Sequence, residues 1–194
     1  NGNNDKINIY IVKSLIRTKK VLNLFAKKVV KDAQSELARQ GKNTSGELSQ
    51  SLGYTITKNQ NGGLTLEFQG SNYAKFVDQG MQGKFSSAKA PNSPYRFGSG
   101  SSSGSWKSFT ASLDKWIVKK GLAGIRDEKG RFVSRKSLRF LIQRSIYLYG
   151  VKPSFFFSNP LEVAKSGLTK KIGKAFMEDA IDFLEQMNKT KSKK

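Results

Sequence analysis

The chain has 194 residues, a formal net charge of +21 at pH 7 and neither cysteine nor histidine. The length suits one domain with a real core, and the missing residue types exclude disulfide scaffolds, Cys/His zinc sites, cysteine nucleophiles and histidine bases. The 14 carboxylates are scattered. We therefore expect no enzyme, no metal and no cofactor, and the charge predicts an anionic partner such as nucleic acid or an acidic protein.

Residues 10 to 40 are predicted to form one long helix. Apolar residues recur there at spacings of three and four, with lysines largely on the other positions, and Gly41 is a plausible C-cap. A hairpin follows, because apolar residues alternate at Tyr54/Ile56 and at Leu64/Leu66/Phe68 around a glycine-bearing turn.

Residues 81 to 150 read as an elaboration of the domain. It begins with a flexible Gly/Ser loop over 81–105 and continues with two helices, at 106–120 and 134–149. Ser134 is expected to cap the second of them. No apolar run approaches the ~18 residues that span a bilayer, so no membrane partner is expected.

Three arginines of the 134–149 helix form a candidate surface for an anionic partner: Arg135, Arg139 and Arg144. Arginine forks suit phosphate and carboxylate groups. Two readings stay open here, a surface facing nucleic acid or an acidic neighbour, and an ordinary solvated helix face.

A final helix is predicted from about Pro160. Its apolar stripe is Phe176, Ala180, Phe183, Leu184 and Met187, and its carboxylates Glu178, Asp179, Asp182 and Glu185 are expected to form a solvated acidic face. A basic tail, 189–194, ends the chain.

Two short motifs are candidates for core packing or assembly contacts. The first is Asn72-Tyr-Ala-Lys-Phe-Val-Asp-Gln-Gly80, in which Tyr73, Phe76, Val77 and Gly80 stand out. The second is Lys152-Pro-Ser-Phe-Phe-Phe-Ser-Asn-Pro160, whose three aromatics are Phe155, Phe156 and Phe157. No ribonucleoprotein motif accompanies these aromatics, so packing or an interface is favoured over base stacking.

The order of these pieces resembles the small head–tail connector and tail-completion proteins of bacteriophages. That family has a Thr/Ser-Gly-x-Leu-x-x-Ser turn before a hairpin, matched by Ser45-Gly-Glu-Leu-Ser-Gln-Ser51, and then a Tyr-Ala-x-aromatic-Val-Glu-x-Gly-Thr segment. Asp78 stands here where the family has glutamate, Met81 replaces the threonine, and a phenylalanine replaces the first proline of the closing Pro-Phe-x-x-Pro motif. The stretch from Gly80 to Pro153 is much longer than in the family.

The resemblance implies an α+β fold in which a small antiparallel sheet packs against a long N-terminal helix and a C-terminal helix. The flexible loop and extra helices are then insertions within one connector-like domain over 1–194. It also implies a structural virion protein of the neck or tail top, made in the host bacterial cytoplasm. Such a protein forms a homo-oligomeric ring around the DNA channel, with portal, neck or tail proteins as neighbours and non-specific contact with packaged DNA. The alternative is a free basic nucleic-acid-binding protein of the packaging or chromatin type.

Overall fold

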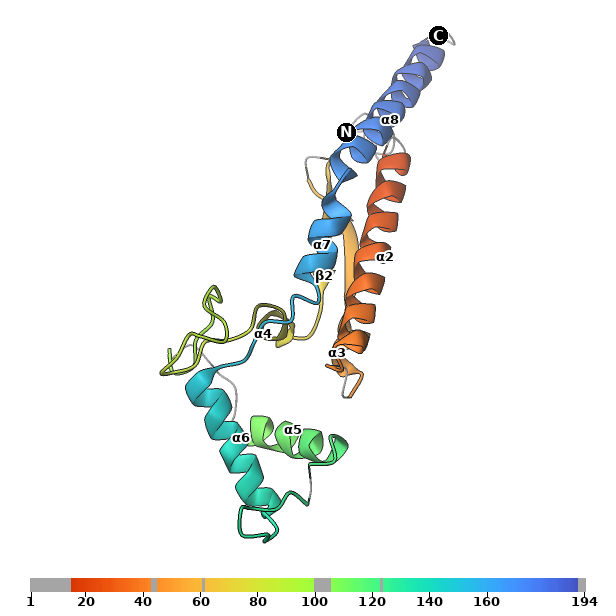
Figure 1. The fold of residues 1–194 in the computed structure, drawn as a ribbon. Coiled ribbons are helices and arrows are strands. Elements are labelled where there is room, and N and C mark those ends of the chain that lie inside the picture. Colours follow the sequence, from red (N-terminus) through yellow and green to blue (C-terminus); the bar gives the residue numbers. More distant parts are fainter. Residues whose placement is uncertain (1–14, 43–44, 61, 100–105, 123, 192–194) are drawn as a thin grey trace. The chain divides into compact units, whose positions relative to one another are not determined.

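A computed structural model describes residues 15–42, 45–60, 62–99, 106–122 and 124–191. The expected α+β class is confirmed: a two-stranded antiparallel sheet is combined with a long N-terminal helix, a long C-terminal helix and extra helices (Figure 1). The elements are, in chain order, α2 (Ile16–Arg39), α3 (Glu47–Ser51), β1 (Gly53–Lys58), β2 (Leu64–Gln69), α4 (Ala74–Gln79), α5 (Trp106–Lys119), α6 (Arg135–Tyr149), α7 (Ser158–Lys165) and α8 (Leu168–Lys191).

Helix α2 carries the core of the first part of the chain. Its buried positions recur at helical spacing, with Ala26, Val29, Ala33 and Leu37 fully enclosed. Helices α7 and α8 and both strands pack on it. The predicted helix start at residues 10–14 lies outside the described residues, and Gly41 has the positive φ of 62° that a C-terminal cap uses.

The predicted hairpin is confirmed, with Tyr54 paired to Phe68 and Ile56 to Leu66. Phe68 stacks edge-on against Phe25 of α2, with ring centroids 6.2 Å apart. The apolar face of the sheet therefore lies on α2, as strands with one apolar face require.

The described chain divides into two compact units. Unit 1 takes the segments up to Arg39, Leu48–Ser71 and from Phe156 onward, and unit 2 takes Gln40–Glu47 and Asn72–Phe155. Unit 2 thus begins before residue 81, where the elaboration was expected to start, and it includes the whole Tyr73–Gly80 motif.

Residues 81–99 of unit 2 differ from the flexible loop that their composition predicted. Gln82 bridges to Arg96, while the backbone N–H groups of Lys84 and Phe85 donate to Tyr147 and Leu148 at 2.9 and 3.1 Å. Composition alone could not show the contacts with Tyr147 and Leu148, because these residues are 63 positions from Lys84 and Phe85. The remainder of that loop, 100–105, lies outside the described residues.

Helices α5 and α6 pack on each other within unit 2. Leu113 and Ile117 of α5 are buried. Ser134 caps α6 as expected, because its Oγ accepts from the N–H of Ser137 at 3.1 Å. On α6, Gln143 is buried, whereas Leu141 and Tyr149 are exposed.

The predicted final helix is two helices. Helix α7 ends before Ser166, and Gly167 adopts φ 74° before α8 begins. Pro160 lies in the first turn of α7, where its missing N–H costs nothing. The basic tail was expected over 189–194, of which 192–194 lie outside the described residues.

Candidate functional site

The candidate site is built from surfaces and backbone contacts. Within the described residues, no group of three or more carboxylates is placed to hold a metal ion. No helix in that part of the chain is long and apolar enough to cross a membrane. Four features therefore carry the functional argument: a backbone clasp, a phenylalanine triplet, an arginine pair and an exposed helix face.

The clasp joins the two sequence motifs. Ser154 donates to the carbonyl of Val77 from its N–H at 3.1 Å and from its Oγ at 2.6 Å. The N–H of Phe155 donates to Asp78 at 2.9 Å, and Met81 and Val151 exchange two backbone hydrogen bonds. Residues 77–81 and 151–155 are thereby held together, although the bonded residues are 70 to 77 positions apart in the sequence.

Gly80 is required by this clasp. It is buried, with φ 73° and ψ −176°, a region that only glycine adopts readily. A Cβ here would lie 2.6 Å from the Val151 carbonyl oxygen and 2.7 Å from the Pro153 nitrogen. The glycine of the first motif therefore permits the close approach of the second.

The aromatic residues of the first motif play separate parts. Phe76 is half-buried and packs edge-on against Tyr95, with centroids 4.7 Å apart, and the Lys75 ammonium lies over both rings. Val77 contributes its carbonyl to the clasp. Tyr73 lies at the N-terminus of α4 with an exposed ring.

The phenylalanine triplet forms an irregular approach to α7. Phe156 is buried, and Phe157 stacks on Phe68 of the sheet with centroids 5.1 Å apart. Phe155 is 43% exposed at φ 50°, the left-handed region that non-glycine residues avoid. The three rings thus separate, with Phe157 covering the sheet and Phe155 facing solvent.

The three arginines of α6 do not form one surface. Arg135 and Arg139 both approach Oδ1 of Asp114 on α5, at 3.3 and 3.6 Å. That oxygen is buried and forms no hydrogen bond with the described residues, so it depends on the two guanidinium charges. Arg144, exposed, is nine positions from Arg135 and so lies on the opposite side of the helix.

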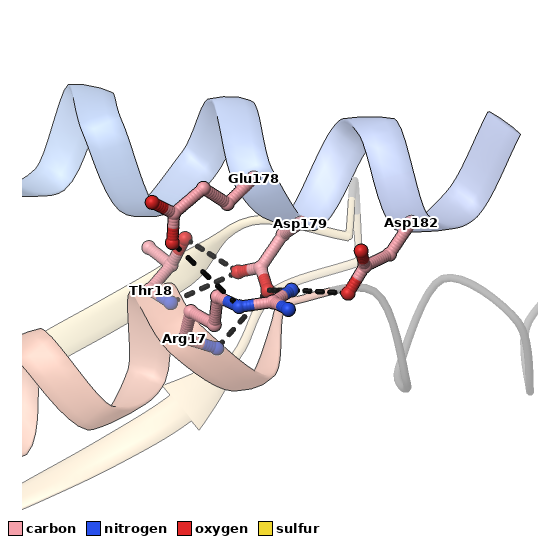
Figure 2. Close-up of polar contacts among 5 residues, drawn as sticks. All are labelled: Arg17, Thr18, Glu178, Asp179 and Asp182. Carbon is pink, nitrogen blue, oxygen red and sulfur yellow. Dashed lines mark hydrogen bonds and ion pairs between the residues drawn. The ribbon is translucent and has the colours of Figure 1, made fainter. Parts of the chain in front are cut away.

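The acidic run of α8 is the feature that sequence reasoning placed wrongly. Asp179 is buried and accepts from the N–H of Arg17 at 3.1 Å and from the N–H and Oγ1 of Thr18 at 2.9 and 2.8 Å (Figure 2). These are the first-turn groups of α2 that a capping side chain normally satisfies. Asp179 therefore caps α2 from another helix.

Arg17 completes this contact. Its guanidinium binds Asp182 and approaches Glu178 at 3.6 Å (Figure 2). The hydrogen bond to Asp182, followed by the charges of that residue, of Glu178 and of Asp179, raises the pKa of Arg17 above its ordinary value. Asp179 is thus buried against α2, and Glu178 and Asp182 are drawn to Arg17 while partly exposed, whereas Glu185 stays exposed as predicted.

The apolar stripe of α8 is consequently left outside. Phe176, Met177 and Leu184 are 56%, 60% and 59% exposed. Ile181 and Met187 on the same helix are also exposed. A contiguous apolar surface of this kind marks an interaction site more often than a free surface. Sequence periodicity found the stripe but not the direction that it faces.

Comparisons of the chain with protein-family models, with curated proteins and with solved structures found no match.

Proposed function

We propose that the protein is a structural virion component of the bacteriophage neck or tail top, which forms a homo-oligomeric ring and joins or completes the head–tail junction around the DNA channel. The observation that carries the proposal is the clasp. The two motifs on which the resemblance rests are bonded to each other through Val77, Asp78 and Ser154, with Gly80 permitting their approach. Motifs that belong to one architecture are expected to meet in this way.

The surface properties fit an assembling subunit. Exposed apolar side chains lie on α8 and also on α6, where Phe140 and Leu141 are more than half exposed. A net charge of +21 opposes self-association in free solution. In the proposed ring, portal, neck or tail neighbours cover the apolar surfaces, and packaged DNA or acidic proteins offset the charge.

The proposal is tested by immunogold electron microscopy of phage particles from the source lysate, with an antibody against this chain. Gold at the junction of capsid and tail supports it. Particles without label, with the protein recovered on free DNA, contradict it.

The second candidate, a free nucleic-acid-binding protein, is favoured by the charge and by the arginine pair. Arg135 and Arg139 share the single carboxylate of Asp114, so these three side chains carry a net charge of one positive unit. This candidate requires DNA affinity that falls steeply with salt as counterions are released. A shallow salt dependence for the isolated chain rejects it.

Charge reversal separates a surface role from a structural one. Arg144→Glu changes an exposed side chain and tests the outward surface. Arg139→Glu instead places a carboxylate beside the buried Asp114 oxygen and is expected to destabilise the α5–α6 pair. Arg144→Glu should therefore keep the fold and lose affinity for anionic partners, and unchanged DNA or neighbour binding would assign Arg144 to a plain solvated face.

A further inference from the structure

We infer that α8 is a docking surface for the α8 of a second copy of this chain, in antiparallel orientation. The surface, here called the outer face, comprises Thr169, Gly173, Phe176, Met177, Ala180, Leu184 and Met187. The inference does not rest on the neck assignment, because an antiparallel pair is a closed two-fold contact and does not by itself propagate a ring.

The outer face cannot turn inward to bury itself. Asp179 fixes the rotation of α8 through its three hydrogen bonds to the start of α2, and Ala175, four positions earlier, is buried on the same side. Turning Phe176 or Leu184 toward α2 would break those bonds. The apolar side chains are therefore available to a partner as the protein stands.

Gly173 is the second observation that points to a partner. It lies inside α8, where glycine weakens a helix relative to alanine. A Cβ at this position would meet no described atom within 4 Å. Packing within the described chain does not account for the missing side chain, whereas close approach by a second helix does, because small residues let helices come together.

Large and small residues of the outer face match those of a second copy. In an antiparallel pair centred near residue 178, Gly173 lies opposite Phe183 or Leu184 of the other copy. Ala180 lies opposite Phe176 or Met177. Each large side chain then meets a small one, which is the arrangement that packs helices without voids. A parallel pair would instead place Phe176 against Phe176 and leave Gly173 against Gly173.

The charges of α8 favour the same orientation. Its first two turns carry lysines at 170, 171 and 174, whereas its middle carries the exposed Glu185 and the partly exposed Glu178 and Asp182, with Asp179 buried against α2. An antiparallel pair puts the basic part of one helix beside the acidic part of the other, within the Debye length of about 10 Å at 0.1 M salt. Elsewhere the strong net charge repels a second copy, so α8 is the place where two copies attract.

Cysteine cross-linking tests the orientation, since the chain has no cysteine of its own. Met177→Cys lies near the proposed two-fold axis and should give a covalent dimer on mild oxidation or with a short bismaleimide. Thr169→Cys is the matched control: it is on the same face but about 27 Å along the axis from its equivalent in an antiparallel partner. It should not cross-link alone, but should do so when mixed with Met187→Cys.

Cross-linking of Thr169→Cys with itself would overturn the antiparallel pairing of two copies. So would Met177→Cys that cross-links only to proteins of other sizes.

Sedimentation velocity of the full chain tests association without a cross-linking reagent. The wild type should shift from monomer toward dimer with concentration, and Leu184→Lys should weaken this by about tenfold or more. Gly173→Leu should weaken it as well, by filling the space that the partner needs.

Val163→Lys is the control, because Val163 is 71% exposed but lies on α7, off the outer face. It should associate like the wild type. Because every substituted side chain is exposed or adjoins open space, each variant should keep the wild-type circular dichroism spectrum. A wild type that stays monomeric at all concentrations, or equal losses in Leu184→Lys and Val163→Lys, would refute the inference.

Discussion

Replacing Asp179 by alanine should destabilise the protein far more than replacing its neighbours on the same helix. The Asp179 side chain is 3% exposed and accepts three hydrogen bonds, from Arg17 N–H and from the N–H and Oγ1 of Thr18. Asp179→Ala leaves these donors without their acceptor, and the Thr18 groups are buried with it. The loss therefore combines a helix cap with a broken charged network in a buried site.

The magnitude follows from those contacts. An N-cap is worth about 1 kcal/mol, and each buried donor left unsatisfied costs about 1–3 kcal/mol. These terms overlap, so we expect a loss of about 2–4 kcal/mol of unfolding free energy in total. At 2–4 °C per kcal/mol for a chain of this size, the melting temperature should fall by roughly 4–16 °C.

The assay is urea denaturation followed by circular dichroism, with Asp182→Ala as the control. Asp182 carries the same charge and also binds Arg17, but both side chains of that pair are 45% exposed. Exposed ion pairs contribute about 0–1 kcal/mol. If Asp179→Ala and Asp182→Ala differ by less than about 1 kcal/mol, the capping role assigned to Asp179 is wrong.

Three further outcomes are expected. Gly80→Ala should lower the unfolding free energy, measured by urea denaturation, by more than about 2 kcal/mol. Gly167→Ala is the control and should cost clearly less, because Gly167 has the same positive φ but an added Cβ would meet no described atom within 4 Å. Equal losses of unfolding free energy would show that the clasp tolerates a side chain. Phe155→Gly should be more stable than Phe155→Ala by about 1 kcal/mol, a reversal of the usual order caused by the φ of 50°, and the usual order would argue against that backbone geometry. The pKa of Asp127 should lie below its ordinary value, because the Arg131 N–H donates to its carboxylate, with lesser help from the Arg131 side chain and the Lys129 N–H. The ionised carboxylate therefore stabilises the turn above about pH 4, and this stabilisation is lost as the pH falls through the lowered pKa of Asp127. An NMR pH titration of the carboxyl carbon measures that pKa. A pKa at the ordinary value would contradict the hydrogen bonds of the turn.

Local patterns predicted local structure well. The hairpin, the buried face of α2, the glycine after α2 and the Ser134 cap follow from spacing and capping chemistry within short stretches of sequence. The break between α7 and α8 was missed, because serine and glycine at 166–167 interrupt a pattern that is otherwise helical on both sides.

The errors concern contacts between distant segments. The stripe of α8 was assigned correctly as apolar, but its direction depends on Thr18, 161 positions from Asp179, whose N–H and hydroxyl both donate to Asp179. Likewise Arg135 and Arg139 were grouped with Arg144 by composition, although Asp114 of another helix selects the first two. Helical spacing already places Arg144 away from the other two, but no local signal identified Asp114.

Unit 1 is built from segments that lie on both sides of unit 2 in the sequence, and this order affects how the chain folds during synthesis. Its helix α2 and hairpin leave the ribosome before Asn72–Phe155, but α7 and α8, which pack on α2, emerge only after that whole stretch. Domains generally fold as units during synthesis at about 5–20 residues per second, so unit 2 has several seconds to fold while α2 waits with its core face uncovered. The nascent chain should therefore be most prone to aggregate, and most in need of chaperones, before Asp179 emerges to cap α2.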